Sequence, residues 1–166
     1  EGQAHVVTAN KGPAAFAYHE LDALAESVDR MFFFEGAVMD GVPVFNLVRE
    51  TMPAITVEGF RGVINTTCNY ILSELARGKE FDTALAEMQA RGTAEAEPSS
   101  DVDGWDAAVK TAAVVNVLMG SLVSPHHVAR GGMRHGSGAD VREAVARNKR
   151  VRLVASARRH GGKIKA

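Results

Sequence analysis

The chain has 166 residues, of which 46% are hydrophobic, and its 19 Lys and Arg residues nearly balance its 20 Asp and Glu residues, giving a net charge of −1. This balance offers no electrostatic case for a nucleic-acid or anionic-membrane partner. A single cysteine, Cys68, excludes an intrachain disulfide and fits a reducing, cytoplasmic compartment. The apolar run within residues 111–123 is interrupted by Asn116 and is too short to span a bilayer.

The first thirty residues predict a strand followed closely by a helix. HVVTANKGP is a β-branched run that ends in Asn-Lys-Gly-Pro, and apolar residues from Phe16 to Val28 then recur at helical spacing. A strand followed tightly by a helix is half of a βαβ unit, typical of a doubly wound nucleotide-binding domain. The Gly-rich loop of such a domain is not recognisable, because the GxG at Gly136–Gly138 follows no strand and is better explained as a helix-capping turn.

The middle of the chain predicts strands and then helices. In residues 31–64, aromatic and β-branched runs are broken by glycine and proline, which favours strands joined by tight loops. The next two segments, NTTCNYILSELARG and DTALAEMQARG, have helical patterns that end on Gly78 and Gly92, and each glycine suits a helix C-cap.

Residues 92–110, GTAEAEPSSDVDGWDAAVK, gather the side chains with the most chemistry. Five carboxylates precede Lys110, namely Glu95, Glu97, Asp101, Asp103 and Asp106. The chain is expected to pass from extended backbone around Pro98 into a helix that starts at Asp103 and has Asp106 and Lys110 on one face. By pattern alone a solvated face with one ion pair is the commoner explanation. The helix continues as TAAVVNVLMG, however, so it is expected to be mostly buried, and its charged stripe must then face partners or a ligand.

The C-terminal part predicts a loop, a helix and two strands. SPHHVARGGMRHGSG is loop-like, ADVREAVARNK is helical, and VRLVASA and GKIKA are strand-like. The order of elements predicts an α/β (α+β) fold, in which an open mixed β-sheet covered by helices is preceded by the last strand-helix piece of a Rossmann-type domain.

Four motifs in chain order, VVTANKGP, FEGAVMDGVPVFNLVRE, GFRGVINTTCNYIL and GTAEAEPSSDVDGWDAAVK, closely resemble homoserine dehydrogenase. The resemblance runs over essentially the whole chain. It implies that residues 1–30 are the C-terminal remnant of the NAD(P)-binding domain, that residues 31–135 form the catalytic and dimerisation domain, and that residues 136–166 supply its closing helix and strands.

The resemblance also implies a reaction. That family uses NAD(P)H to reduce L-aspartate 4-semialdehyde reversibly to L-homoserine, on the aspartate pathway to threonine and methionine, as a cytoplasmic homodimer or higher homo-oligomer. This fragment alone is expected to be inactive, because half of the nucleotide site lies outside it. Two other interpretations stay open: a non-catalytic dimerisation or regulatory module, and a dehydrogenase of a related small amino-acid aldehyde.

Residue roles follow from the resemblance position by position. Lys110 matches the catalytic lysine that gives a proton to the aldehyde oxygen, and Asp106, Glu95 and Asp101 match carboxylates at the substrate. Asn10 and Lys11 match the place where the nicotinamide end of NAD or NADP meets the substrate. The chemistry agrees, because an ammonium stabilises a developing alkoxide and carboxylates suit the ammonium of an amino-acid substrate. By pattern alone, Lys11 is as readily an ordinary loop lysine.

Two further features come from the same resemblance. Glu35, with the backbone at Val38, Asp40 and Val42, matches a loop that binds a monovalent cation such as Na+ in some members, whereas by pattern alone Glu35 is solvated. The family usually has Asn-Gly-Thr where this chain has Asn65-Thr66-Thr67, so a glycine is missing from a strand-to-helix turn. The backbone N–H groups at that helix start are a candidate site for the substrate carboxylate.

Other side chains have plainer explanations. His126, His127 and His135 have no cysteine or carboxylate at metal-ligand spacing, so a loop role is expected. Cys68 has no identifiable base beside it and is expected to be a small buried residue. The basic residues between positions 142 and 165 are expected to form a solvated face, because no aromatic residue accompanies them.

Overall fold

A computed structural model describes residues 4–92, 98–133 and 138–166, and the chain divides into two compact units. Unit 1 comprises Glu1–Arg61, Ala108–Ala129 and Ser156–Ala166, and unit 2 comprises Gly62–Ala107 and Arg130–Ala155. The predicted α/β class is confirmed, since helices accompany small sheets. Within the described residues the strands form one two-stranded sheet, which includes the predicted strand of the Rossmann-type piece, and one three-stranded sheet.

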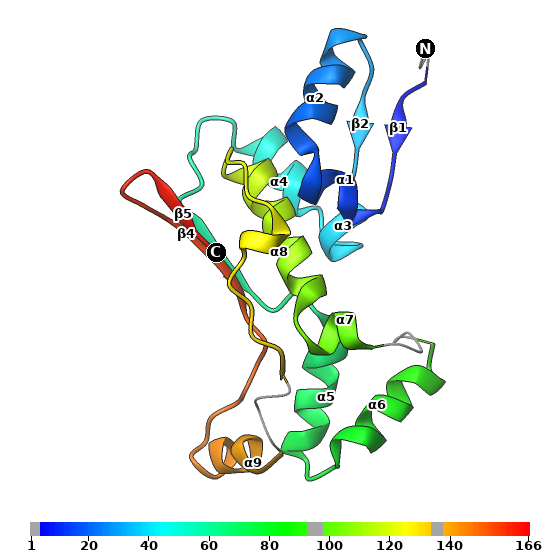
Figure 1. Ribbon diagram of the computed structural model, residues 1–166, viewed down its shortest axis with the longest axis vertical. Coiled ribbons are helices and arrows are strands. Elements are labelled where there is room, and N and C mark those ends of the chain that lie inside the picture. Colours follow the sequence, from blue (N-terminus) through cyan, green and yellow to red (C-terminus); the bar gives the residue numbers. More distant parts are fainter. Residues whose placement is uncertain (1–3, 93–97, 134–137) are drawn as a thin grey trace. The chain divides into compact units, whose positions relative to one another are not determined.

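Unit 1 begins with a βαβ arrangement. Strand β1 (Val6–Val7) pairs in parallel with β2 (Phe32–Phe33), and helices α1 (Lys11–Phe16) and α2 (Tyr18–Ser27) connect them (Figure 1). The predicted strand and helical segment are confirmed. The helical segment is two helices because it is interrupted at Ala17, whose φ of −145° is not helical.

The prediction of strands throughout residues 31–64 is wrong for residues 36–51. Helix α3 (Gly36–Met39) and helix α4 (Val44–Thr51) occupy this stretch, and strand β3 (Gly59–Gly62) is confirmed. A residue outside helix α4 stabilises it. The carboxylate of Glu35 accepts hydrogen bonds from the backbone N–H groups at the start of the helix. That long-range cap overrides the strand preference of the aromatic and β-branched residues, and it is not visible in a local pattern.

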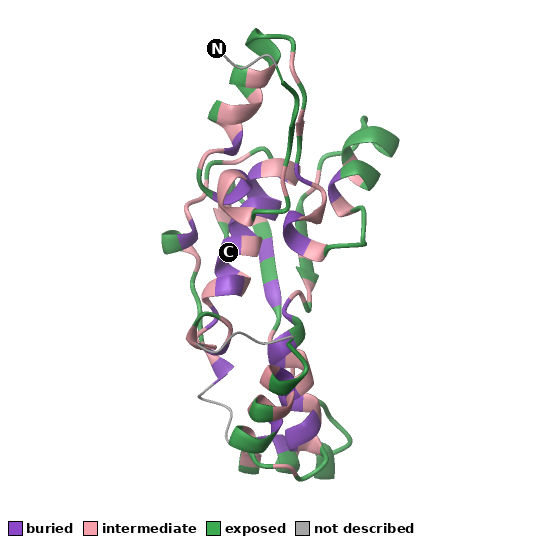
Figure 2. Cartoon of the chain, turned by 90° about the vertical axis from the view of Figure 1, so that its right-hand side faces the viewer, coloured by how far each residue is buried: buried purple, intermediate pink, exposed green. Residues whose placement is uncertain are grey.

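The three-stranded sheet has the order β3-β4-β5, and it belongs to unit 1 apart from its boundary residues. Strand β4 (Ala155–His160) pairs antiparallel with β5 (Lys163–Lys165), with Arg159 opposite Ile164. A Cβ atom on Gly59 would lie 2.6 Å from the carbonyl oxygen of Ala157, so the glycine permits close approach of β3 and β4. Buried and exposed residues alternate along β4 (Figure 2).

Of the two predicted C-terminal strands, the second is confirmed and the first begins later than predicted. Strand β5 lies within the predicted GKIKA segment, but β4 begins only at Ala155, whereas a strand was expected from residue 151. Val151 and Leu153 instead pack against the hydrophobic core of unit 2, so their apolar side chains are used in helix packing and not in the sheet.

Unit 2 is built from helices. Helix α5 (Thr66–Ala76) packs against α6 (Phe81–Ala90), α7 (Ser99–Val102) and α9 (Gly138–Ala146). Its core consists of buried apolar side chains from these helices and adjoining segments: Cys68, Ile71, Leu72, Leu75, Ala84, Val102, Met133 and Val141. The predicted helix ends at Gly78 and Gly92 are confirmed, and both glycines have positive φ.

Helix α8 (Trp105–Leu118) contains residues of both units. The prediction that it is mostly buried is confirmed, because every residue from 108 to 116 is buried except Lys110. In unit 1, the amide of Asn116 donates to the carbonyl oxygens of Ala15 and Val123 and accepts from the N–H of Val123, which satisfies the polar group inside this helix. Across the described ranges, no helix has both the length and the apolar character needed to cross a bilayer.

Candidate functional site

A buried cluster of polar side chains lies at the start of α5 in unit 2. The Oδ1 atom of Asn65 accepts a hydrogen bond from the N–H of Cys68 at 2.8 Å, which caps the helix. The Nδ2 atom of the same side chain donates to Asp101 Oδ1 at 2.7 Å and to Asp106 Oδ2 at 2.9 Å. Asn65 is 4% exposed and Asp106 is 5% exposed. Two carboxylates therefore converge on one buried amide group.

The two carboxylates come from consecutive helices. Asp101 lies in α7, which begins after Pro98, and Asp106 lies in the first turn of α8, where the helix dipole favours a negative charge. Between them the chain turns at Gly104, whose φ of +78° is in the region that glycine adopts most readily. The helix start predicted at Asp103 is thus found two residues later, and the backbone around Pro98 starts a helical turn where extended chain was expected.

The loop at residues 130–132 packs against this turn. A Cβ atom on Gly132 would lie 2.6 Å from the carbonyl oxygen of Val102, so only glycine fits there without displacement. The guanidinium of Arg130 donates to the carbonyl oxygen of Asp103 at 3.1 Å and lies 5.0 Å from the centre of the Trp105 ring. These contacts within unit 2 fix the backbone that carries the two carboxylates.

Cys68 is part of the same cluster but is not a nucleophile. Its side chain is fully buried, and its Sγ atom donates to the carbonyl oxygen of Asp101 at 3.2 Å. Burial, followed by the charges of Asp101 and Asp106, raises the pKa of Cys68 to about 12. The thiol therefore stays protonated at neutral pH, and the prediction of a small buried residue is confirmed.

Lys110 lies on α8 four residues after Asp106, a spacing that puts both on one face of the helix. Its side chain is only partly buried, in contrast to its helix neighbours. Glu95 and Glu97, the remaining predicted carboxylates, lie outside the described residues. Of the predicted substrate residues, the structure thus brings Asp101 and Asp106 together, through Asn65.

Asn65 is the residue that sequence reasoning missed. The sequence draws attention to it only within the Asn65-Thr66-Thr67 segment and predicts no role for its side chain. The pattern does contain a clue, because an asparagine immediately before a helical run is a preferred N-cap residue. The convergence of Asp101 and Asp106 on the same side chain could not be predicted, because those residues lie more than 30 positions away in the sequence.

Asn10 and Lys11 lie where β1 gives way to α1 in unit 1. The Oδ1 atom of Asn10 accepts from the N–H of Gly12 at 2.8 Å and caps the helix, and its own N–H donates to Thr8 Oγ1 at 3.0 Å. Lys11 is the first residue of α1 and is partly buried. Both residues therefore follow the carboxyl end of a parallel strand, the edge at which doubly wound sheets bind nucleotides.

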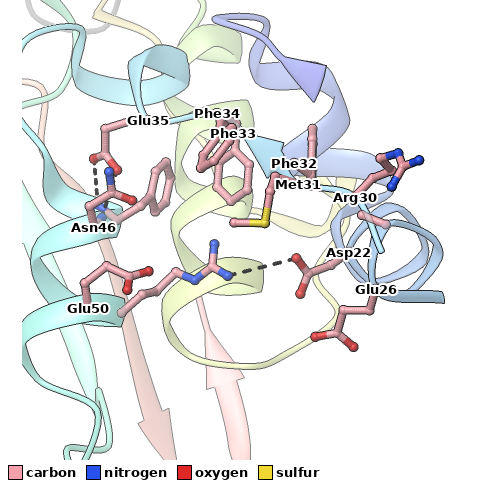
Figure 3. A pocket seen from close by; sticks show the side chains of 13 residues that line it. Asp22, Glu26, Arg30, Met31, Phe32, Phe33, Phe34, Glu35, Asn46 and Glu50 are labelled. Carbon is pink, nitrogen blue, oxygen red and sulfur yellow. Dashed lines mark hydrogen bonds and ion pairs between the residues drawn. The ribbon is translucent and has the colours of Figure 1, made fainter. Parts of the chain in front are cut away.

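Glu35 lines a pocket of about 210 Å³ in unit 1, between α2, β2 and α4 (Figure 3). Its carboxylate oxygens accept from the N–H groups of Phe45 at 2.9 Å and Asn46 at 2.8 Å. Elsewhere in the pocket the guanidinium of Arg49 lies 4.0 Å from Asp22 and 5.8 Å from the centre of the Phe34 ring. In this structure the Glu35 carboxylate therefore acts as a helix cap for α4.

The sequence predicts a loop role for His126, His127 and His135. His126 and His127 lie in the short 3-10 helix η1 (Pro125–His127), and the ring of His126 is 6.1 Å from that of Phe16. His135 lies outside the described residues. In the ranges that the structure describes, no group of three or more His, Cys, Asp or Glu side chains is arranged to hold a metal ion.

Comparison with known proteins gives a consistent result. The family model described as homoserine dehydrogenase matches residues 43–166. The NAD(+)-dependent homoserine dehydrogenase of Pseudomonas canavaninivorans is 37% identical over 163 residues, which are 98% of this chain and 46% of that protein. The homoserine dehydrogenase of Methanocaldococcus jannaschii is 41% identical over 117 residues, 70% of this chain and 35% of that protein. The chain thus spans less than half the length of these curated relatives.

Solved structures agree with the sequence relatives. A homoserine dehydrogenase from Thiobacillus denitrificans matches 96% of this chain and 37% of its own chain, with a TM-score of 0.87 and 37% identity. A hyperthermophilic archaeal homoserine dehydrogenase in complex with NADPH matches 97% of this chain and 46% of its own, with a TM-score of 0.80 and 34% identity. The α/β fold is shared with these structures over nearly the whole of this chain.

Proposed function

Because this chain belongs to the homoserine dehydrogenase family, we propose that the protein containing it reduces L-aspartate 4-semialdehyde reversibly to L-homoserine with NAD(P)H. The family resemblance predicted from the four sequence motifs is confirmed by the match over residues 43–166 and by the relatives. The observation that carries the proposal is the pair of carboxylates, Asp101 and Asp106, held together at the start of the helix that carries Lys110.

The carboxylates are proposed to bind the ammonium group of the amino-acid substrate. Asp106 is buried and Asp101 partly buried, and both offer carboxylate oxygens to a cation. A charge-assisted hydrogen bond to an ammonium is stronger than a neutral one. Glu95 is proposed to join Asp101 and Asp106 on the strength of the family resemblance. The substrate carboxylate, which this anionic group would repel, is proposed to bind at the N–H groups of the α5 start, where Thr66 is exposed.

Lys110 is proposed as the proton donor. When hydride reaches the aldehyde carbon, negative charge develops on the aldehyde oxygen, and a positioned ammonium stabilises that charge and supplies the proton. In the reverse direction, the neutral amine accepts the proton of the homoserine hydroxyl. The partial exposure of Lys110 on an otherwise buried stretch of α8 supports this role, because its side chain is not enclosed by the core.

A nicotinamide cofactor fits the residues at the end of β1. NAD or NADP, when bound, supplies the hydride in one direction and accepts it in the other. Asn10 and Lys11 are proposed to contact its nicotinamide end, with Lys11 also close to the reacting carbonyl group. Asn10 uses its Oδ1 atom to cap α1, so its Nδ2 group is the donor that it can offer to a cofactor oxygen. The relative from Pseudomonas canavaninivorans is an NAD(+)-dependent homoserine dehydrogenase, and the hyperthermophilic archaeal structure is a complex with NADPH.

A monovalent cation such as Na+ is proposed near Glu35, with backbone carbonyl groups of Val38, Asp40 and Val42 as further ligands. The support is the family resemblance of this loop. A cation would share the Glu35 carboxylate with the N–H groups of α4, since each carboxylate has acceptor capacity for more than one partner. A higher melting temperature in NaCl than in choline chloride of equal ionic strength, lost in Glu35→Gln, would support this site.

The cellular compartment, the pathway and the oligomeric state of the enzyme are also proposed. We place it in the cytoplasm, on the route from aspartate to threonine and methionine, as a homodimer or higher homo-oligomer. The support is the family to which the chain belongs, together with a free, buried cysteine at position 68. Light scattering of the purified protein tests the oligomeric state.

The assay for the proposed function is L-homoserine-dependent reduction of NADP and of NAD, followed by the absorbance of the reduced nicotinamide. The protein that contains this chain together with an upstream Gly-rich strand-helix unit is expected to turn over. The chain by itself is expected to show negligible turnover, and saturable tight binding of NADPH to it in titration calorimetry would contradict that expectation. A folded longer protein that is inactive with both cofactors would favour a non-catalytic module instead.

A further inference from the structure

The side chain of Asn65 can take only one orientation in its site. Its Oδ1 atom accepts from the backbone N–H of Cys68, which can only donate, and its Nδ2 atom donates to one carboxyl oxygen of Asp101 and one of Asp106. Exchanging the oxygen and nitrogen positions would put a donor against a donor and an acceptor against two acceptors. The helix cap therefore determines which end of the amide meets the carboxylates.

The amide also lies between two carboxyl groups, one on a buried side chain and one on a partly buried side chain. Carboxylates that converge repel each other, and a side chain such as Asp106, which is 5% exposed, has little water to screen that repulsion. The two N–H bonds of the Asn65 amide give one donor to each carboxylate, at 2.7 Å and 2.9 Å. No other uncharged side chain of similar length combines a capping oxygen with two such donors.

We propose that Asn65 is a positioning residue for substrate binding. It holds the carboxylates of Asp101 and Asp106 together as one anionic binding site for the substrate ammonium. The inference rests on the proposed function, and it adds a residue that does not itself touch the reacting atoms. Each carboxylate gives one oxygen to the amide, and a carboxylate can accept more than one hydrogen bond. Asn65 thereby links the start of α5, where the substrate carboxylate is proposed to bind, to the proposed binding site of the substrate ammonium.

Two substitutions separate capping from positioning. Serine is as good an N-cap residue as asparagine, but its short side chain has a single O–H and cannot donate to both carboxylates. Asn65→Ser is therefore expected to keep the helix cap and to fold, with a lower melting temperature because the two carboxylates lose their donors, while the KM for L-homoserine rises about tenfold to a hundredfold. Asn65→Asp also keeps a capping oxygen but adds a third carboxylate, so its KM for L-homoserine is expected to rise further.

The kinetic constants distinguish a positioning role of Asn65 from a merely structural role. Positioning predicts a change in the KM for L-homoserine with the KM for the nicotinamide cofactor unchanged and kcat within about threefold. A loss of stability alone would lower the amount of active enzyme without this selectivity. Asn69→Asp makes the same chemical change one helical turn further along α5 and is the matched control, with the KM for L-homoserine expected to stay within about twofold.

The outcomes distinguish this inference from the proposed function. Wild-type activity combined with unchanged KM for L-homoserine in both Asn65 variants would overturn the positioning role and leave the enzyme assignment intact. A wild-type protein without activity would overturn the proposed function, and the side-chain N–H signals of Asn65 would then test the geometry by NMR. They are expected to be protected from solvent exchange and to shift in Asp101→Asn, and fast exchange with no shift would overturn the inference.

Discussion

The two units contain amphipathic helices of the same kind but use them differently. In unit 2, helix α5 buries its apolar face completely, and Leu75 is 2% exposed. In unit 1, helix α2 has an equally regular apolar pattern, yet Leu24 is 58% exposed and Val7 of the neighbouring sheet is 80% exposed. Periodicity therefore predicts which face of a helix is suited to burial, but not whether the described chain supplies a surface to cover it.

The proposed chemistry is divided between the same two units. The carboxylates Asp101 and Asp106 and the amide that joins them belong to unit 2, whereas the proposed cationic groups, Lys11 and Lys110, belong to unit 1. Helix α8 is the element that contains both kinds, with Asp106 in its first turn and Lys110 one turn later. Substitutions in one unit can therefore be compared with matched substitutions in the other.

The largest effect is expected at Lys110. Lys110→Ala removes both the positive charge and the proton donor, and we expect kcat of the cofactor-competent protein to fall about a thousandfold or more, with the thermal melt unchanged. Lys110→Arg is the matched control, since it keeps the charge but is a poor proton donor at neutral pH. Its kcat is expected to lie between those of Lys110→Ala and the wild type. Activity of Lys110→Ala within tenfold of the wild type would contradict the role.

The difference in burial between the apolar faces of α5 and α2 is tested by a Leu→Ala substitution in each helix. Leu75→Ala empties a buried position and is expected to lower the free energy of unfolding by about 2–5 kcal/mol. Leu24→Ala removes a largely exposed side chain and is expected to change it by no more than about 0.5 kcal/mol. Urea denaturation of the two variants measures both. Equal losses would mean that the face of α2 is covered in solution.

A smaller effect is expected in the loop that supports the carboxylates. In Gly132→Ala the new Cβ atom would lie 2.6 Å from the carbonyl oxygen of Val102, so the loop or the turn must move. We expect a loss of about 1–3 kcal/mol in the free energy of unfolding, with a raised KM for L-homoserine. Gly131→Ala is the matched control, because a Cβ atom there meets nothing within 4 Å. Identical behaviour of the two variants in thermal melts would argue against the close contact.

The smallest effect is expected from the ion pairs that join α5 to α6 in unit 2. Lys79 donates to Glu74 and Glu87 at 2.7 Å, and Arg77 also pairs with Glu74. The hydrogen bond from Lys79 is the main cause that lowers the pKa of Glu74 and of Glu87, and bonds to Glu74 and then Glu87 raise the pKa of Lys79.

These pKa shifts determine how the stability of the fold changes with pH. The lowered pKa values of Glu74 and Glu87 stabilise the fold above the ordinary carboxyl pKa of 4.5, and this stabilisation is lost as the pH falls through the folded-state values. The raised pKa of Lys79 stabilises the fold below 10.5, and this contribution is lost as the pH rises through the folded-state value. Lys79→Met should therefore flatten both limbs of the melting temperature against pH, and an unaltered profile would exclude the network as their source.

Local sequence patterns were sufficient where neighbouring residues decide the structure. The strand and helix at the start of the chain, the helices that end at Gly78 and Gly92, and the burial of α8 follow from periodicity and from the positive φ of glycine. The same patterns failed for residues 36–51, because the cap of α4 comes from a carboxylate nine residues before the helix starts. They also placed β4 too early, because Val151 and Leu153 pack in a helical core.

The sequence by itself determined the family, the α/β class and the order of carboxylates followed by a lysine on a mostly buried helix, since these depend on residue identity and spacing along one chain. Only the tertiary structure decided that Asp101 and Asp106 share one amide, because Asn65 reaches them from a different helix. The physical reason is that a hydrogen bond requires atoms within about 3 Å of each other, and separation along the sequence carries no such distance.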